Sequence, residues 1–401
     1  MSLGLPTLPD QSFHRVTRGS QVLGFIAIDS VVGGRARGGL RIADGLSEDE
    51  IRAASRAMTL KYGFLGLPQG GAKAGIVGDA EVPLEEKRRL LGEFARAAAP
   101  LLHARRYVPD PDLGTCADDV RWMMESIGAE VAARDWRANR SGEYTARSAL
   151  ATAMAVRERQ SASLAGCRVA IEGFGKVGAA LAMMLHDRGA RVVAISTSRG
   201  ALHAPDGLDV ARLARRAAAV GSRFVEDEPG RIERAALLEL AVDVLFPCAR
   251  FHSIDAANAP RVAAPAICAG ANDPVSPEAE DVLRARGVVY PPDFVSNCGG
   301  VLGGTLEFAG VTAERIGALV EERVRREVLS LMSRAERRGV PARTLAESDA
   351  LERHAAVRAR IKHPDLAQRL ISLAIEGYRR RWVPERVVAL LAPRYVARKR
   401  G

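Results

Sequence analysis

Two lysines and one aspartate have the residue types that proton transfer requires. Lys61 and Lys73 stand at the two ends of KYGFLGLPQGGAK, and Asp112 follows in VPDPDLGT. The 58 basic residues of the chain are mostly arginine, and a lysine, unlike an arginine, can lose its proton when burial or a charged neighbour lowers its pKa. One ammonium can neutralise a substrate carboxylate, while the other polarises a carbonyl or activates water and the aspartate carries the proton. This set favours chemistry on an amino acid or a 2-oxo acid.

A glycine-rich turn provides a second candidate site. Its residues fit the pattern G-x-G-x-x-G and are Gly173, Phe174, Gly175, Lys176, Val177 and Gly178. The turn follows the strand-like segment RVAIE and opens a helix, within a βαβ unit over residues 167–196. Gly173 permits a tight turn, Gly175 lets a pyrophosphate approach the backbone, and Gly178 allows the helix to pack closely on the strand. The segment therefore predicts a dinucleotide site.

The end of the second strand in this βαβ unit bears on the choice of dinucleotide. An acidic residue at this place would bind the 2′-hydroxyl of the ribose in NAD. The chain has Thr197, Ser198 and Arg199 there instead. Two hydroxyls and a guanidinium are compatible with a 2′-phosphate, so the sequence predicts NAD or NADP without deciding between them.

The elements that position Lys61, Lys73 and Asp112 follow from apolar patterns and turn residues. The sequence predicts a strand over 22–32, a glycine-rich turn over 33–41 and a glycine turn just before Lys73. A helix begins at Ser47, with Glu50 at the capping-box position, and runs towards Lys61. Residues 107–115 are predicted to form a loop because of their two prolines.

The later part of the chain predicts a different architecture. The polar segment RANRSGEY at 137–144 marks a domain boundary, and the βαβ unit lies beyond it. Short apolar runs at 242–246, 264–269 and 287–290 are expected to continue a parallel sheet. Beyond about residue 312 the pattern is that of long helices. The fold class is therefore α/β.

Composition limits the compartment and the kinds of partner. The start of the chain lacks the pattern of a secretory signal, and no apolar run approaches the ~20 residues that span a bilayer. Five scattered cysteines indicate reduced thiols, so we expect a cytoplasmic protein without a structural metal. The net charge is +10, yet arginines alternate with acids along the predicted helices, as on a solvated helix face. We therefore expect neither a nucleic acid nor a membrane as partner.

Several motifs together resemble the glutamate/leucine/phenylalanine/valine dehydrogenase family. The segment MTLKYGFLGLPQGGAKAGI at 58–76 is similar to the family signature, in which two lysines stand twelve residues apart. Further matching motifs follow in the order of the family: RARGGLR (35–41), VPDPDLGT (108–115), EGFGKVG (172–178), FPCA (246–249), GAND (270–273) and SNCGG (296–300). The resemblance implies reversible NAD(P)-dependent oxidative deamination of an L-amino acid to a 2-oxo acid and ammonia, with glutamate favoured.

The resemblance also implies roles for single residues. Lys61 would bind the α-carboxylate of the substrate, Lys73 would activate water, and Asp112 would transfer the proton to and from nitrogen. Asn297 would orient substrate and nicotinamide. Further implied contacts are Val301 to the substrate and Thr145, Ala249 and Asn272 to the cofactor.

The fold that the resemblance implies has three parts. Residues 1–140 would form an α/β domain for substrate binding and dimerisation, and residues 145–335 a doubly wound Rossmann-type domain for NAD(P). Residues 336–401 would form helices that return to the first domain. The family usually forms homo-oligomers, so a hexamer or another oligomer is expected, with a paralogous subunit as a further possibility.

Departures from the family pattern leave the substrate open. Arg37 stands where glutamate dehydrogenases have a lysine that binds the side-chain carboxylate, which favours an acidic substrate. Asp110, at a pocket position that is usually alanine, can pair with Arg37 instead. Gly304 would leave extra room in the pocket. A branched-chain or aromatic substrate, or a catalytically silent regulatory subunit, therefore remains an alternative, and the atypical segment 377–401 is expected to be a subunit contact or a solvated tail.

Overall fold

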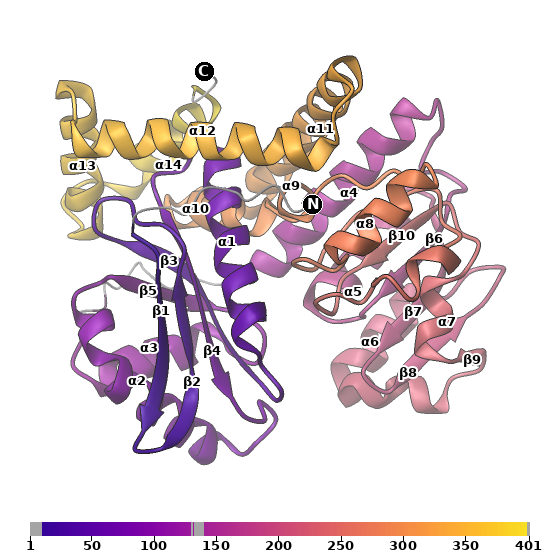
Figure 1. Cartoon of the computed structure of the whole chain (residues 1–401), viewed down its shortest axis with the longest axis horizontal. Coiled ribbons are helices and arrows are strands. Elements are labelled where there is room, and N and C mark those ends of the chain that lie inside the picture. Colours follow the sequence, from indigo (N-terminus) through magenta and orange to yellow (C-terminus); the bar gives the residue numbers. More distant parts are fainter. Residues whose placement is uncertain (1–9, 130, 132–139, 399–401) are drawn as a thin grey trace. The chain divides into compact units, whose positions relative to one another are not determined.

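The protein is described here by a computed structural model that covers residues 10–129, 131 and 140–398. Figure 1 shows the chain as helices and two sheets. The described residues divide into two compact units, one formed by those within 1–139, 305–311 and 347–401 and the other by 140–304 and 312–346. We call them unit 1 and unit 2 and describe each by itself. No helix in the described ranges combines the length and apolar character needed to cross a membrane.

Unit 1 contains a five-stranded mixed sheet in the order β1-β2-β4-β3-β5. The strands are β1 (Ser12–Arg18), β2 (Gln21–Ile28), β3 (Ala36–Ala43), β4 (Gly70–Val77) and β5 (Tyr107–Pro111). The helices of its first part are α1 (Glu48–Leu65), α2 (Leu84–His103) and α3 (Ala117–Ser126). β3 runs parallel to both β4 and β5, whereas β2 runs antiparallel to β1 and β4.

The two faces of this sheet differ in character because successive side chains of a strand point to opposite sides. On one face, apolar residues of β3 and β4 such as Leu40 and Ala74 pack with Phe94 of α2 and Met123 of α3. The other face lies against α1, since a Cβ added to Gly71 of β4 would come within 2.3 Å of the Thr59 backbone. Polar side chains on this second face of the sheet are therefore held against a helix.

The predicted glycine-rich turn at 33–41 is wrong for most of its length. The turn is confined to Gly33 and Gly34, which have positive φ angles, and β3 begins at Ala36. Glycine is needed inside the strand for close approach: a Cβ on Gly38 would lie 1.6 Å from the carbonyl oxygen of Ala72 in β4. The same error affected β4, because Lys73 lies within a strand rather than after a glycine turn.

The predicted loop at 107–115 is also wrong at its start, where β5 forms despite two prolines. β5 is an edge strand that pairs only with β3 within the sheet. The backbone carbonyl of Arg106 accepts a hydrogen bond from the N–H of Ala36 in β3. Alternate residues from Arg106 onwards therefore direct their backbone groups towards β3, whereas the backbone groups of Pro109 and Pro111 point away from the sheet. A proline is tolerated there because no ladder hydrogen bond is lost.

The later residues of unit 1 are helical. They belong to α12 (Ala342–Lys362), α13 (Leu366–Arg379) and α14 (Glu385–Arg398), together with the end of α10 (Gly299–Phe308). α12 packs closely on α1, since a Cβ on Gly63 would lie 2.1 Å from the carbonyl oxygen of Ala350. Arg353 also donates to the carbonyl of Phe64 at 2.9 Å.

Unit 2 contains a second five-stranded sheet in the order β10-β6-β7-β8-β9. Its strands are β6 (Arg168–Glu172), β7 (Arg191–Thr197), β8 (Gly200–His203), β9 (Arg231–Ile232) and β10 (Val244–Pro247). Its helices are α4 (Ser141–Arg159), α5 (Lys176–Asp187), α6 (Val210–Val220), α7 (Arg234–Leu238), α8 (Pro277–Ala285), α9 (Asp293–Ser296), the start of α10, and α11 (Ala313–Arg338). Of the polar segment predicted at 137–144, residues 137–139 lie outside the described part of the chain.

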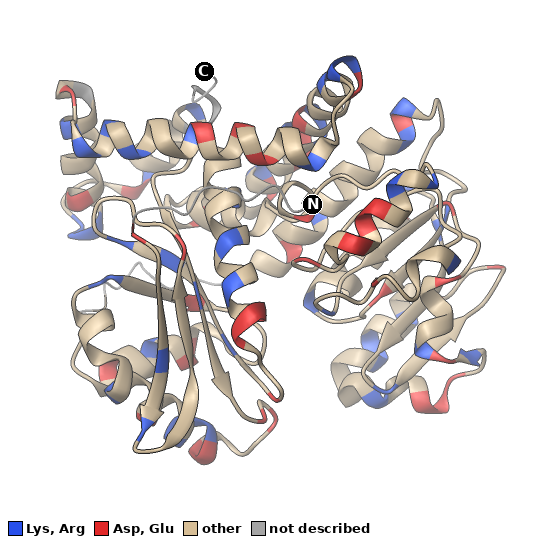
Figure 2. Cartoon of the chain, viewed as in Figure 1, with Lys and Arg blue, Asp and Glu red and all other residues tan. Residues whose placement is uncertain are grey.

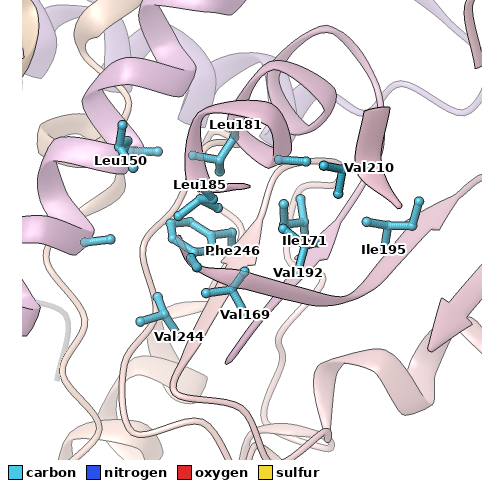
Figure 3. Packing of buried hydrophobic residues seen from close by; sticks show 14 of the residues in the cluster. Leu150, Val169, Ile171, Leu181, Leu185, Val192, Ile195, Val210, Val244 and Phe246 are labelled. Atoms are coloured by element: carbon cyan, nitrogen blue, oxygen red, sulfur yellow. The ribbon is translucent and has the colours of Figure 1, made fainter. Parts of the chain in front are cut away.

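The sheet of unit 2 is parallel only in part. β6 runs parallel to β7 and β10, and bridges carry the parallel pattern on to Ile267 and Val289, as the apolar runs predicted. β8 and β9 instead add antiparallel strands at the other edge. Figure 3 shows part of the core of unit 2, in which Leu185 of α5 lies beside Phe246 of β10, and Leu150 of α4 belongs to the same cluster.

Figure 2 shows basic and acidic residues scattered over both units, mostly on helices and loops, with no large area of a single sign. Many of the arginines form ion pairs, such as Arg326 with Glu322 at 3.0 Å along α11 and Arg147 of α4 with Glu321 of α11 at 2.7 Å. Exposed pairs of this kind add little stability each, about 0–1 kcal/mol, but they disperse the positive charge.

Candidate active site

The centre of the candidate site is an ion pair between Lys73 and Asp112 in unit 1. Lys73 lies on the face of β4 that is turned towards α1, and its Nζ binds Oδ2 of Asp112 just after β5. The lysine is buried, whereas about a quarter of the aspartate side chain is exposed. The structure therefore brings together two of the three residues that the sequence singled out.

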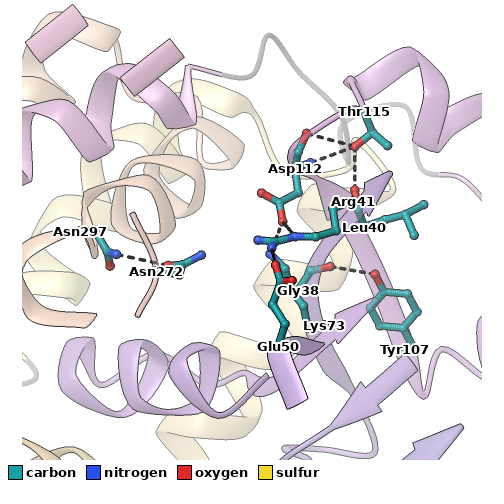
Figure 4. A network of polar contacts seen from close by, with 10 residues as sticks. All are labelled: Gly38, Leu40, Arg41, Glu50, Lys73, Tyr107, Asp112, Thr115, Asn272 and Asn297. Atoms are coloured by element: carbon teal, nitrogen blue, oxygen red, sulfur yellow. Dashed lines mark hydrogen bonds and ion pairs between the residues drawn. The ribbon is translucent and has the colours of Figure 1, made fainter. Parts of the chain in front are cut away.

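Two residues that sequence reasoning missed complete the network, as Figure 4 shows. Arg41 of β3 donates through Nε to Oδ2 of Asp112 at 3.2 Å. The other end of its guanidinium binds Glu50 in the first turn of α1. Glu50 was predicted to cap the helix; Ser47 does accept from its backbone N–H at 3.1 Å, but its carboxylate binds Arg41 instead. Arg41 was present in the motif RARGGLR, and strand alternation from Gly39 would have placed it on this face.

The position of Asp112 is also set by its backbone. Its N–H donates to Oγ1 of Thr115 at 2.9 Å, and the same hydroxyl donates to the carbonyl of Leu40 in β3 at 2.8 Å. Gly39 makes the pair possible, because a Cβ there would lie 2.7 Å from Cβ of Asp112 and 2.9 Å from Nζ of Lys73. The carboxylate is thus held in place before any substrate binds.

The protonation of the pair follows from burial and from neighbouring charges. Burial lowers the pKa of Lys73; Asp112 opposes this shift, and Arg41 adds to it. Burial alone would raise the pKa of Asp112, but Lys73 and Arg41 hold the pKa of this carboxyl below its usual range. A lysine whose pKa is lowered, next to a carboxylate that stays charged, is suited to acid–base catalysis. Of the two causes considered from the sequence, burial and a charged neighbour, burial is the larger for Lys73.

Lys61 is buried in the later part of α1, with only 5% of its surface exposed. It lies on the helix against which β4 packs. A buried ammonium is costly unless it is compensated, which is consistent with a structural or a carboxylate-binding role.

Arg37 and Asp110 form the internal ion pair that was one of two alternatives. Arg37 of β3 donates through Nε to both carboxylate oxygens of Asp110 in β5, at 3.1 and 2.9 Å. Both side chains remain partly exposed, at 26% and 33%. The guanidinium is therefore not a free carboxylate receptor.

In unit 2 the glycines of the turn at 173–178 differ in their surroundings. Gly173 has a φ angle of +97°, and a Cβ on Gly178 would lie 1.8 Å from the carbonyl oxygen of Gly173, so both glycines are required by the turn itself. Gly175 differs, because a Cβ there would meet no atom within 4 Å. Open space above the backbone at the start of α5, whose first N–H groups have no partner within the helix, fits a pyrophosphate.

The residues predicted to bind the adenosine ribose lie at a hairpin. Thr197 ends β7 and donates to the carbonyl of Ser222 at 3.0 Å. Ser198 and Arg199 form the exposed turn to β8. The hydroxyl of Thr197 is thus engaged within the protein, whereas Ser198 and Arg199 face solvent.

Asn297 is held in unit 2 with one amide atom unused. Its Nδ2 donates to the carbonyl of Ala271 at 2.7 Å and to Oδ1 of Asn272 at 3.2 Å. Its Oδ1 is buried and has no hydrogen-bond partner among the described residues. A buried acceptor without a partner is costly, so this oxygen fits a donor such as the carboxamide of a nicotinamide.

The remaining predicted residues also belong to unit 2. Thr145 of α4 lies beside the start of α10, since a Cβ on Gly300 would lie 2.6 Å from its Oγ1. Ala249 contacts the glycine turn, because a Cβ on Gly173 would lie 2.7 Å from its Cβ. Val301 lies on α10 and is partly exposed.

Two family models together match most of the chain. Residues 139–361 match the glutamate/leucine/phenylalanine/valine dehydrogenase family, and residues 13–129 match the dimerisation domain of the Glu/Leu/Phe/Val dehydrogenases. The chain belongs to this family. The predicted family is thereby confirmed, and so is the α/β fold class with two sheets.

Among relatives of this dehydrogenase-family chain are glutamate dehydrogenases of both cofactor types. The NAD-specific glutamate dehydrogenase of Staphylococcus aureus (strain COL) is 34% identical over 287 residues, which is 67% of each chain. The NADP-specific glutamate dehydrogenase A1 of Halobacterium salinarum is 33% identical over 285 residues, again 67% of each chain.

Solved structures of the family share the fold. The hetero-hexameric glutamate dehydrogenase of Thermus thermophilus, in its leucine-bound form, has a TM-score of 0.74 at 29% identity and covers 87% of this chain and 89% of its own. The glutamate dehydrogenase of Peptoniphilus asaccharolyticus has a TM-score of 0.63 at 24% identity, with 84% and 86% covered.

Proposed function

We propose that this chain is an NAD(P)-dependent dehydrogenase that deaminates an L-amino acid, with glutamate favoured, to a 2-oxo acid and ammonia, and catalyses the reverse reaction. The observation that carries this proposal is the Lys73–Asp112 pair, in which a buried lysine with a lowered pKa binds a carboxylate that stays charged. Membership of the family and relatives that are NAD- or NADP-specific glutamate dehydrogenases support it.

The residues of unit 1 account for the proton transfers. A nicotinamide dinucleotide, when bound, would supply the acceptor for the hydride that leaves Cα of the amino acid. Asp112 takes the proton that the amino group loses as the substrate becomes an iminium. Lys73, in its neutral form, takes a proton from the water that attacks the iminium carbon, and Asp112 returns its proton to the nitrogen of the resulting carbinolamine. As ammonia leaves and the carbonyl forms, Asp112 takes the hydroxyl proton, and the two protons then held by Lys73 and Asp112 pass to ammonia and to solvent. Lys61 neutralises the α-carboxylate.

The residues of unit 2 would hold the dinucleotide. The backbone of the turn from Gly173 to Gly178 receives the pyrophosphate at the start of α5. The unpartnered Oδ1 of Asn297 would accept a hydrogen bond from the nicotinamide carboxamide, and Thr145, Asn272 and Ala249 would contact the adjoining ribose. The exposed Ser198 and Arg199 would be available to a 2′-phosphate, and both NAD and NADP are therefore proposed as cofactors. We therefore propose unit 1 for substrate binding and unit 2 for NAD(P) binding.

The test is a spectrophotometric screen of the purified protein for NAD(P) reduction with all common amino acids. We expect turnover with glutamate, and the variant Lys73→Ala should lower kcat by a factor of about a thousand because general acid–base catalysis contributes on that order. NAD(P)H binding, measured by fluorescence, should be unchanged.

A matched control is Lys87→Ala, which removes a lysine from another ion pair in unit 1, with Asp119 at 2.7 Å. This control should retain normal kcat. An absence of turnover with every amino acid would contradict the enzymatic function and favour a silent regulatory subunit, whereas near-normal kcat in Lys73→Ala would contradict the role of that lysine.

We further propose that the chain works as an oligomer of identical subunits in the cytoplasm. The T. thermophilus relative is a hetero-hexamer, so a paralogous subunit is the alternative composition. Five free cysteines, of which Cys167, Cys268 and Cys298 are buried, fit a reducing compartment. Light scattering of the purified chain gives the number of subunits directly.

A further inference from the structure

We propose that Asp110 determines substrate specificity by competing with the side-chain carboxylate of the substrate for Arg37. The proposal rests on the function given above and concerns the same site. It predicts that the native enzyme discriminates weakly between glutamate and amino acids with uncharged side chains, and that removing the Asp110 carboxylate increases the preference for glutamate.

The first argument is the position of the pair on the sheet. Arg37 lies two residues before Gly39 in β3, and Asp110 two residues before Asp112 at β5. Residues two apart on a strand share a face and are about 6.6 Å apart. Arg37 and Asp110 are therefore one step along the strands from the Lys73–Asp112 pair, on the same face.

The second argument is reach. A substrate whose reacting Cα is next to Lys73 and Asp112 has a side chain that extends from that point. The side-chain carboxylate of glutamate is separated from Cα by two methylene groups, which is of the order of the spacing between the two pairs. The partial exposure of both Arg37 and Asp110 leaves them accessible to a ligand.

The third argument is charge. Arg37 binds both oxygens of Asp110 through Nε, so the pair has no net charge. The other guanidinium on this face, Arg41, already binds Asp112 and Glu50. The buried phenol of Tyr62 interacts with both charges: its pKa is raised, mainly by burial and also by Asp110, and Arg37 partly opposes the shift. This neighbour supplies no cation.

The chemical consequence is a competition between two carboxylates. An incoming glutamate must share Arg37 with Asp110, and the two like charges repel each other. A leucine or norvaline side chain is uncharged and is not repelled by the Arg37–Asp110 pair. Asp110 therefore weakens the binding of acidic substrates selectively, because it acts on the side-chain carboxylate alone.

The experiment compares kcat/KM for glutamate and leucine in the native chain and in Asp110→Ala and Asp110→Asn. We expect the ratio of the glutamate value to the leucine value to rise about tenfold in Asp110→Ala, the effect of gaining one charge-assisted hydrogen bond and losing one repulsion. Most of the change should be in KM. Asp110→Asn keeps the shape without the charge and should move the ratio in the same direction.

The matched control is Asp118→Ala. Asp118 of α3 is also paired with an arginine, Arg121 at 3.2 Å, but its side chain is 83% exposed. This control should leave the ratio unchanged. If the ratio rose in Asp118→Ala as well, the effect would come from net charge and the proposal would be overturned. An unchanged or lower ratio in both Asp110 variants would overturn it as well.

A binding measurement separates this inference from the proposed function. Glutarate, which has both carboxylates and cannot react, should bind Asp110→Ala more tightly than the native chain by calorimetry. Tighter glutarate binding without turnover in any variant would support the competition and reject the enzymatic function. Turnover without any gain in glutarate affinity would reject the competition alone.

Discussion

At the scale of single residues, the decisive feature is that Asp112 is shared between a titratable and a permanent cation. Lys73 and Arg41 both bind its Oδ2. The guanidinium lowers the pKa of Lys73 by repulsion and that of Asp112 by attraction. It therefore makes both groups available as bases at a lower pH than either would be without it.

The pH profile of kcat/KM tests this role of Arg41. In Arg41→Met the pKa values of Lys73 and Asp112 should both rise, because the guanidinium lowers both. The acidic limb of the profile should consequently move to higher pH, by about one unit for the loss of a nearby charge. A profile that keeps its position, with kcat lowered equally at every pH, would show that Arg41 only supports the fold.

Arg15→Met is the control for this prediction. Arg15 also pairs with a glutamate of the first turn of α1, Glu48, but the arginine is well exposed. Its removal should leave both limbs of the profile in place.

The sequence predicted residue types better than residue partners. Lys73 and Asp112 could be recognised because few side chains combine titratability with such glycine- and proline-rich surroundings. Arg41 and Glu50 could not be paired, because the glycines of RARGGLR predict a turn, and a turn does not put alternate residues on one face. The Arg37–Asp110 pair was foreseen as one of two alternatives, and geometry was needed to decide between them.

At the scale of elements, glycines have two different purposes that the sequence does not distinguish. Some allow the backbone to turn or two strands to approach, as Gly38 does, and others leave room for a ligand. Within the motif at 173–178, Gly178 allows close backbone packing, and Gly175 leaves room for a ligand. The two can be separated by experiment.

The variant Gly178→Ala should destabilise the protein, because its Cβ would lie 1.8 Å from the carbonyl oxygen of Gly173. Overpacking of this kind costs about 1–3 kcal/mol in the free energy of unfolding. Gly175→Ala should leave the melting temperature unchanged, because its φ of −95° suits alanine and no atom is near. It should nevertheless weaken NAD(P)H binding about tenfold or more, since the new methyl group occupies the space for the pyrophosphate.

Titration of NAD(P)H fluorescence and thermal melts of the two variants provide the measurement. Equal losses of stability would mean that both glycines serve the fold. Unchanged cofactor affinity in a stable Gly175→Ala variant would place the pyrophosphate elsewhere.

Elements were predicted well where periodicity is strong and poorly where glycine or proline interrupts it. The βαβ unit over 167–196 and the helix after Ser47 were predicted from their patterns and their capping residue. β3, β4 and β5 were missed because glycine and proline normally disfavour strands. Here the glycines permit close strands and a packed helix, and the prolines lie on an outer edge, both of which depend on tertiary context.

At the scale of the whole molecule, the described chain has separate cores in its two units. The residues around Leu40 and Phe94 belong to unit 1 and those around Phe246 to unit 2. A ligand stabilises the part that it binds, by about 2.7 kcal/mol at a concentration of one hundred times Kd. The proposed function therefore predicts that NAD(P)H slows amide hydrogen exchange more in unit 2 than in unit 1.

Hydrogen exchange with and without saturating NAD(P)H tests this expectation. Slower exchange should appear first in β6, the start of α5 and β7, and β3, β4 and β5 should change less. The reverse order would contradict the assignment of the dinucleotide to unit 2. The order of the family motifs predicted an α/β fold for the whole chain, because these motifs lie in both units. No local pattern predicted the antiparallel strands β8 and β9.

The prolines of β5 also affect how the protein can associate. An edge strand normally presents a row of free N–H and C=O groups, to which a strand of another molecule can add. Pro109 and Pro111 remove two successive donors from the outer side of β5. A strand from another chain would find too few donors there to form a ladder. The sheet of unit 1 is therefore protected against aggregation along β5, and β1 is the edge through which it can be extended.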